Sequence, residues 1–127
     1  MTIFHRLLLY SLLIFLGISL IIPGLIEMFK LNIGKSWIIC ENIDAKNHLR
    51  SFNAMMTAVG LIAVWACFNL DHSRLLVIAL GIVMMLLVVS RVYSIIVDCM
   101  PGSKTLLYLA IETGLALVFL VLPPVTK

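Results

Sequence analysis

The sequence predicts an all-α membrane protein, a four-transmembrane-helix antiparallel bundle with up-down-up-down order. Hydrophobic residues make up 63% of the 127 residues and charged residues only 12%, about half the charged share of a soluble domain. The apolar residues gather in four runs, each close to the roughly 20 residues that cross a hydrocarbon core of about 30 Å. A soluble chain of this length has no core large enough for so much apolar surface, so we expect one polytopic domain, residues 1–127, in a bilayer.

The first helix is predicted over residues 7–26, a run without a charged side chain. Pro23 and Gly24 are expected to kink or end its last turn, because proline cannot donate a backbone hydrogen bond. Glu27 follows directly and either reaches the membrane interface or turns inward. The polar connection that comes next, residues 28–44, is the longest in the chain.

The second helix is predicted over residues 45–70. Ala54 and Ala58 form a pair of small residues that suits close helix packing. A different face of this helix carries polar or small residues at spacings of three and four, which place them above one another: Arg50, Asn53, Thr57 and Gly60.

The third and fourth helices are predicted over residues 75–97 and 105–122. The short polar turn 69–74 makes the second and third helices antiparallel neighbours, and Pro101 and Gly102 form a second tight turn before the fourth helix. Polar residues again recur at helical spacing on both helices: Arg91, Ser94 and Asp98 on the third, and Thr105, Tyr108 and Glu112 on the fourth.

Arg91 and Glu112 lie almost symmetrically about this second turn. In an antiparallel hairpin they reach the same depth, roughly 10 Å from the turn at 1.5 Å per residue. A charge at that depth costs about 2.5–3.5 kcal/mol, so it is seldom retained without a partner. We therefore predict an intramembrane ion pair, with Arg50 next to either Glu112 or Asp98. The polar faces together predict a charged pocket on the side of the first and third loops, lined by Arg50, Asn53, Arg91, Ser94, Asp98, Tyr108 and Glu112.

Three sequence patterns support a resemblance to a known family. The second helix opens with Asn-x-x-Arg from Asn47, the third ends with Arg-x-x-Ser-x-x-x-Asp from Arg91, and the fourth holds Glu112. In these patterns and in length the chain resembles the "domain of unknown function 4345" family of small bacterial four-helix membrane proteins. The resemblance covers nearly the whole chain, although the first helix and the loop after it match only loosely. It implies the fold and the membrane, and it brings no activity.

Two of the three cysteines fall on one side of the membrane. Cys40 lies in the first loop and Cys99 in the third, so a disulfide between them can form if that side is periplasmic. Cys67 lies within the second helix as a small packing residue. The absence of a C-x-x-C pattern disfavours a thiol oxidoreductase.

Charges and cysteines favour opposite orientations. By the positive-inside rule the loops would be cytoplasmic, because the loop side carries more basic residues than the terminal side: Lys30, Lys35, Lys46, Arg50 and Lys104. Arg6 in the short N-terminal tail and the paired loop cysteines favour cytoplasmic termini. We expect a multi-pass protein of the bacterial inner membrane with its termini in the cytoplasm.

Three functions remain open from the sequence. The first is a non-enzymatic protein that binds a small or lipid-derived anion through Arg50 and Arg91. The second is a homo-oligomeric ion or proton channel or transporter, with Arg91 and Glu112 along its path. The third is a purely structural ion pair that fixes which helices associate.

Enzymatic activity is disfavoured by the sequence. It contains no metal-ligand cluster, no nucleophile–base spacing and no phosphate-binding glycine loop, so we expect no catalytic residue, no metal and no cofactor. No cluster of basic residues suggests nucleic acid. The expected partners are the lipid bilayer and further copies of the chain, because Ala110 and Gly114 add a second small-residue pair that favours a dimer or trimer.

Overall fold

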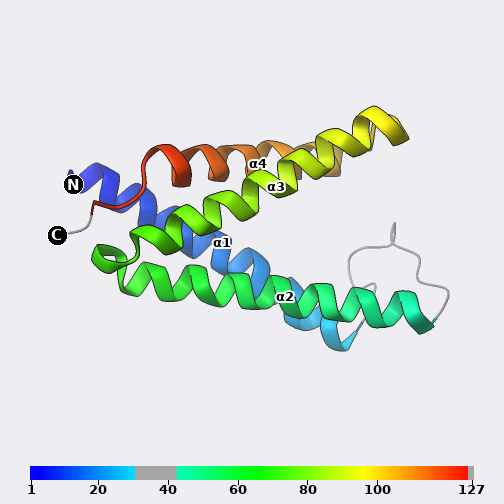
Figure 1. Cartoon of the computed structure of the whole chain (residues 1–127). Coiled ribbons are helices and arrows are strands. Elements are labelled where there is room, and N and C mark those ends of the chain that lie inside the picture. The colour runs from blue at the N-terminus through cyan, green and yellow to red at the C-terminus, as the bar shows by residue number, and fades with distance from the viewer. Residues whose placement is uncertain (31–42, 126–127) are drawn as a thin grey trace. The chain divides into compact units, whose positions relative to one another are not determined.

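The computed structural model describes residues 1–30 and 43–125. Within these residues the chain is helical and forms no strand, which confirms the all-α fold class (Figure 1). The described residues form four α-helices, each long and apolar enough to cross a membrane, as in a multi-pass membrane protein. The elements follow in the order α1 (Ile3–Phe29), α2 (Ile43–Phe68), the short 3₁₀ helix η1 (Leu70–His72), α3 (Arg74–Asp98) and α4 (Ser103–Val121).

Helix α1 extends beyond the predicted residues 7–26 at both ends. Pro23 lies inside it, and the helix continues to Phe29 instead of ending at the proline. Proline is tolerated in membrane helices when the backbone group that loses its partner is satisfied in another way. Of the two expected effects of Pro23 and Gly24, an end to the helix is therefore wrong and a kink stays a prediction. Lys30 N still donates to Ile26 O at 2.8 Å just beyond the helix.

Helix α2 ends at Phe68, two residues before the predicted boundary at residue 70. The chain tightens here into η1, in which His72 N donates to Asn69 O at 3.0 Å. Ser73 is fully buried, and its Oγ donates to Asn69 O at 2.7 Å. These local bonds compete with continuation of the α-helix. The other boundaries, in α3 and α4, differ from the predicted ones by one or two residues.

The chain divides into two compact units. One is Leu13–Phe68, with most of α1 and all of α2, and the other combines Met1–Leu12 with Asn69–Lys127 and so includes α3 and α4. We describe each unit by itself. The up-down-up-down order of all four helices remains a prediction, since it concerns both units.

In the α1–α2 unit the two helices meet through glycines. A Cβ atom added at Gly60 would lie 3.0 Å from Gly17 O and 2.8 Å from Cγ1 of Ile21, and one added at Gly17 would lie 2.5 Å from Cγ2 of Val64. Backbone thus lies against backbone, which is how small residues associate membrane helices in the absence of a hydrophobic driving force.

A third glycine continues this contact toward the first loop. A Cβ at Gly24 would collide with Oγ1 of Thr57 and lie 3.0 Å from Asn53 O. Because α1 residues of rising number meet α2 residues of falling number, the two helices are antiparallel. The close contact uses these glycines rather than the predicted pair Ala54 and Ala58, of which Ala58 is exposed.

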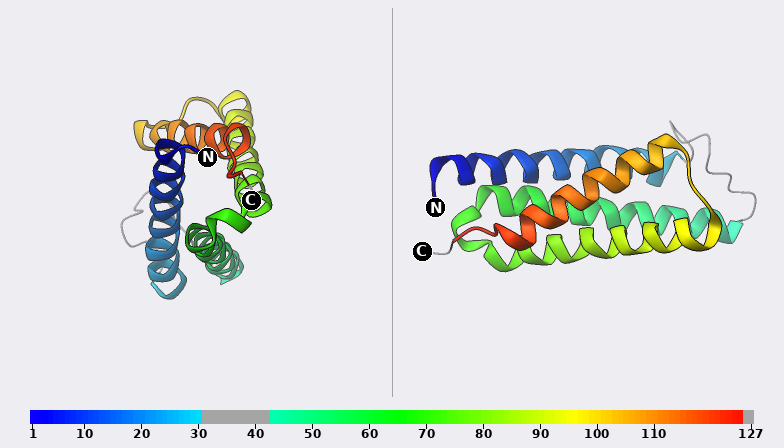
Figure 2. Two further views of the ribbon diagram at one scale, coloured as in Figure 1. Left: turned by 90° about the vertical axis from the view of Figure 1, so that its left-hand side faces the viewer. Right: turned by 90° about the horizontal axis from the view of Figure 1, so that it is seen from above.

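In the other unit α3 and α4 form an antiparallel hairpin, in which α4 runs obliquely to α3 (Figure 2). A Cβ at Gly81 would lie 2.9 Å from Cγ of Leu120 and 3.1 Å from Cβ of Phe119, so the helices touch closely far from their connecting turn. The buried residues of the hairpin lie in the same region: Val77, Leu80, Gly81 and Met84 on α3, and Leu115, Ala116 and Phe119 on α4. Nearer the turn, large apolar residues are exposed and available to lipid.

The glycine contact predicts opposite effects for two alanine substitutions. Gly60→Ala would force α1 and α2 apart and destabilise the protein by about 1–3 kcal/mol, as overpacking does. Gly114→Ala is the matched control, since nothing lies within 4 Å of an added Cβ and alanine favours a helix by up to about 1 kcal/mol. Unfolding of both variants as monomers in detergent measures the difference. Equal stability of the two variants would contradict the observed packing.

Candidate functional site

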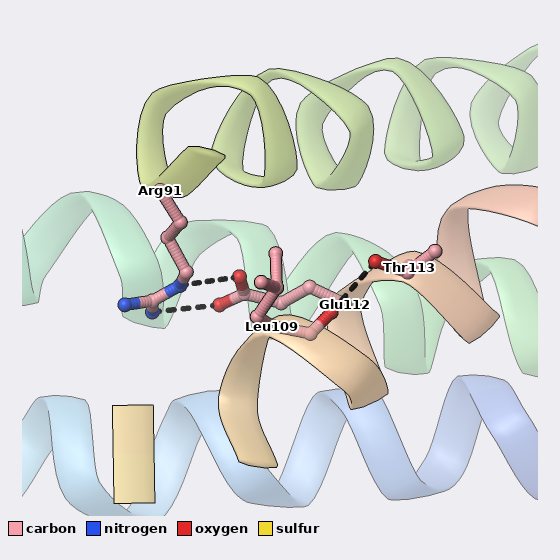
Figure 3. Close-up of polar contacts among 4 residues, drawn as sticks. All are labelled: Arg91, Leu109, Glu112 and Thr113. Carbon is pink, nitrogen blue, oxygen red and sulfur yellow. Dashed lines mark hydrogen bonds and ion pairs between the residues drawn. The ribbon is translucent and has the colours of Figure 1, made fainter. Parts of the chain in front are cut away.

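The central polar contact of the α3–α4 hairpin joins Arg91 to Glu112. Arg91 Nε donates to Glu112 Oε2 at 2.6 Å, and Nη2 donates to Oε1 at 2.8 Å, as the two parallel dashed lines in Figure 3 show. This two-pronged geometry is the strongest arrangement that a guanidinium and a carboxylate form, and it fixes direction as well as distance. We call this ion pair the clasp.

One neighbour on α4, Tyr108, completes the surroundings of the clasp. The ring centroid of Tyr108 lies 5.7 Å from Cζ of Arg91, within the range of a cation–π contact. Tyr108 is four residues before Glu112, so the helix presents both side chains on one face. Thr113 does not join them, because its Oγ1 donates to Leu109 O at 2.7 Å within α4 (Figure 3).

The clasp is neither fully buried nor fully open. The side chain of Arg91 is 31% exposed and that of Glu112 is 14% exposed. Nη1 of Arg91 lies on the side of the guanidinium away from Glu112 (Figure 3), and it makes no hydrogen bond to any residue among 1–30 and 43–125. The arginine therefore has donors left for another group.

Ser94 and Asp98 form a separate pair on α3. Ser94 Oγ donates to Asp98 Oδ2 at 2.9 Å, one helical turn apart and exposed. The predicted pocket residues of this hairpin thus fall into two groups, one around Arg91 and one at the end of α3. No hydrogen bond or ion pair among the described residues connects the two groups.

Arg50 binds the end of helix α1. Its Nη1 donates to Met28 O at 2.5 Å and to Phe29 O at 3.1 Å. These carbonyls have no partner within the helix, and a cation also complements the negative end of the helix dipole. Glu27, just before them, is buried with 3% exposure, so it turns inward. Arg50 belongs to one unit and Glu112 and Asp98 to the other, so the predicted proximity of Arg50 to either acid remains a prediction.

Asn53 and Thr57 lie on the face of α2 that packs against α1. They are 3% and 7% exposed. Asn53 Nδ2 donates to Leu49 O at 3.0 Å, and Thr57 Oγ1 donates to Asn53 O at 2.9 Å. Both groups are satisfied by the backbone of their own helix, so helix packing accounts for their burial.

A polar contact that we did not predict holds the start of α1. Arg6 forms an ion pair with Asp71 of η1, and Nε2 of His5 donates to Leu122 O at the end of α4 at 2.7 Å. The available signal was that Arg6 and Asp71 flank apolar runs on the same predicted side of the membrane. The side chain of Arg6 is 40% exposed and that of Asp71 is 37% exposed.

Other sequence predictions concern metals and cysteines. Within residues 1–30 and 43–125 no group of three or more His, Cys, Asp or Glu is arranged to hold a metal ion. Cys99 is exposed and its thiol is free in this part of the chain, and Cys67 is buried. Cys40 and Lys35 lie outside the described residues, so the Cys40–Cys99 disulfide remains a prediction.

Comparison with known proteins agrees with the resemblance derived from the sequence. The family model described as "Domain of unknown function (DUF4345)" matches residues 8–123. No curated protein and no solved structure matches the chain.

The clasp predicts a strong energetic coupling between its two residues. Arg91→Met and Glu112→Gln should each destabilise the protein, because each leaves an ionised partner in apolar surroundings, and the double variant should recover part of the loss. We expect a coupling energy of about 1–3 kcal/mol from a double-mutant cycle in bicelles.

The exposed pair at the end of α3 supplies the control for this cycle. Ser94→Ala and Asp98→Asn should show a coupling below about 0.5 kcal/mol, as exposed helical pairs do. Strictly additive losses at Arg91 and Glu112 would mean that the two side chains do not interact in the membrane.

Proposed function

The chain belongs to the domain-of-unknown-function family DUF4345, and from its geometry we propose an integral membrane protein that binds a phosphate group at the clasp. The phosphate belongs to a small or lipid-derived molecule, and Arg91 is the residue that binds it. The proposal depends on one observation above all: Arg91 is held in place by Glu112 and Tyr108, yet it is 31% exposed and keeps unused donors.

The unused donors suit a phosphate. A guanidinium has five N–H groups, and two of them serve Glu112, so about three are free. Their planar fork matches two phosphate oxygens, and a pre-oriented arginine loses little side-chain freedom on binding. A residue that served only to join two helices would have no need of an exposed outer edge.

The position of the clasp along α3 supports binding of a lipid headgroup. Arg91 lies seven residues before the end of α3, roughly 10 Å along the axis. Tyr93 and Tyr108 are exposed at similar positions, 66% and 43%, and tyrosine is typical of the membrane interface. Long arginine side chains extend toward that interface from inside the membrane.

A channel receives less support from the hairpin. Beyond Glu112, toward the end of α4, the buried side chains of α4 are apolar, and Thr113 already donates to its own helix. A proton or ion that reached Glu112 would meet no further polar side chain among Leu115, Ala116 and Phe119. Moving a charge past these residues is costly in a medium without water.

We propose the membrane setting that the sequence indicates: the bacterial inner membrane, cytoplasmic termini, and a dimer or trimer. Self-association is supported by the exposed residues Ala110 and Gly114 on α4, since nothing lies within 4 Å of a Cβ added at Gly114. A second helix could approach this face closely.

Binding of phospholipid to the purified protein tests the proposed function. Native mass spectrometry should show lipid retained by the wild type and by Arg74→Met, which removes an exposed arginine at the far end of α3. The double variant Arg91→Met/Glu112→Gln should retain the lipid at least about tenfold less well, since a hydrogen bond to a charged group contributes about 1.5–3 kcal/mol. If this double variant is folded and retains lipid as the wild type does, the clasp is structural and the proposal fails.

A further inference from the structure

We propose that the ligand of the clasp is a zwitterion that joins a primary ammonium group to a phosphate, as the headgroup of an aminophospholipid does. The inference rests on the function proposed above and names the class of molecule that this site accepts. The phosphate binds Arg91 and the ammonium group binds Glu112, so each charge of the ligand meets its opposite.

The first argument is the net charge of the site. Arg91 and Glu112 sum to zero, and neither forms an ion pair with any other residue in the described part of the chain. Asp98, the acid at the end of α3, lies seven residues from Arg91, which is roughly 10 Å away along the helix, and its Oδ2 accepts from Ser94. A ligand therefore meets a neutral pair and not a cationic pocket.

The second argument is the cost of an uncompensated charge. A simple anion bound to Arg91 would leave the complex with a net negative charge beside the carboxylate of Glu112. In apolar surroundings such a charge is expensive, and it also repels the like charge of Glu112. A ligand that brings its own cation leaves the complex neutral, so the penalty does not arise.

The third argument is the hydrogen-bonding capacity that Arg91 and Glu112 retain after they have bonded to each other. A carboxylate accepts up to about four hydrogen bonds, and Glu112 receives two from Arg91. The same contact leaves Arg91 with donors on Nη1, on the outer side of the pair (Figure 3). The same ion pair thus keeps hydrogen-bond donors on Arg91 and acceptor capacity on Glu112, which is what a zwitterion needs.

The remaining acceptor sites favour a primary ammonium group over a trimethylammonium group. A primary ammonium group donates up to three hydrogen bonds and is small, which suits a carboxylate whose side chain is only 14% exposed. A trimethylammonium group has no N–H to donate. It would bind best against an aromatic face, and Tyr108 already has the guanidinium of Arg91 over its ring.

Three phospholipids that differ only in the headgroup test this inference on the wild-type protein, and Arg91→Met shows which retention depends on the clasp. We expect native mass spectrometry to show phosphatidylethanolamine retained at least tenfold better than phosphatidylglycerol and phosphatidylcholine with the same acyl chains. A competition experiment with soluble O-phosphoethanolamine shows whether the ligand is a small molecule or a lipid. Displacement of the lipid at millimolar concentration supports a small zwitterion, whereas lipid that stays bound supports the membrane lipid.

A charge-changing variant sharpens the test. Glu112→Gln makes the site cationic, so its preference should reverse to phosphatidylglycerol, while Asp98→Asn, which removes an acid outside the clasp, should keep the wild-type preference. If wild-type protein prefers phosphatidylglycerol in an Arg91-dependent manner, the zwitterion inference is wrong and the proposed function stands. If no phospholipid depends on Arg91, both are wrong.

Discussion

A charge that enters apolar surroundings must meet an opposite charge, and this constraint organises the α3–α4 hairpin. Arg91 and Glu112 each cost several kcal/mol to place alone in hydrocarbon, and each removes the penalty of the other at 2.6 and 2.8 Å. A shift of one residue along either helix would turn its side chain by about 100° and break both hydrogen bonds. The clasp therefore sets the register of the hairpin, and register places Tyr108 against the guanidinium.

The α1–α2 unit holds its helices together by a different means. Its contact depends on Gly17, Gly24 and Gly60, where the backbones approach too closely for a side chain, and Arg50 binds the carbonyls at the end of α1. Arg50, Asn53 and Thr57 in this unit donate to backbone carbonyls, whereas the side chains of the clasp bond to each other and still expose donors. This difference is why we propose binding at the α3–α4 hairpin.

The apolar runs were enough to predict four membrane-length helices, because length and composition decide that property. Placement about the turn at Pro101 and Gly102 was also enough to bring Arg91 and Glu112 to one level. Helical spacing shows which residues share a face, but it does not show what that face meets. The same spacing of Asn53 and Thr57 is expected for residues that line a pocket and for residues that pack against another helix. The acceptors of Arg50 lie on another helix, so the sequence of α2 alone does not indicate them. Because of Pro23, the predicted end of α1 came too early: loss of one backbone donor does not end a membrane helix.

The contact between Arg91 and Glu112 in a bilayer is the central claim, and solid-state NMR measures it directly. In protein with ¹⁵N-labelled arginine and ¹³C-labelled glutamate carboxyl groups, dipolar recoupling should report a guanidinium nitrogen within about 4 Å of a carboxyl carbon, as two hydrogen bonds of normal length require. That signal should vanish in Glu112→Gln and persist in Asp71→Asn, which removes the ion-pair partner of Arg6. A spectrum of the wild type in lipid without this coupling would contradict the account.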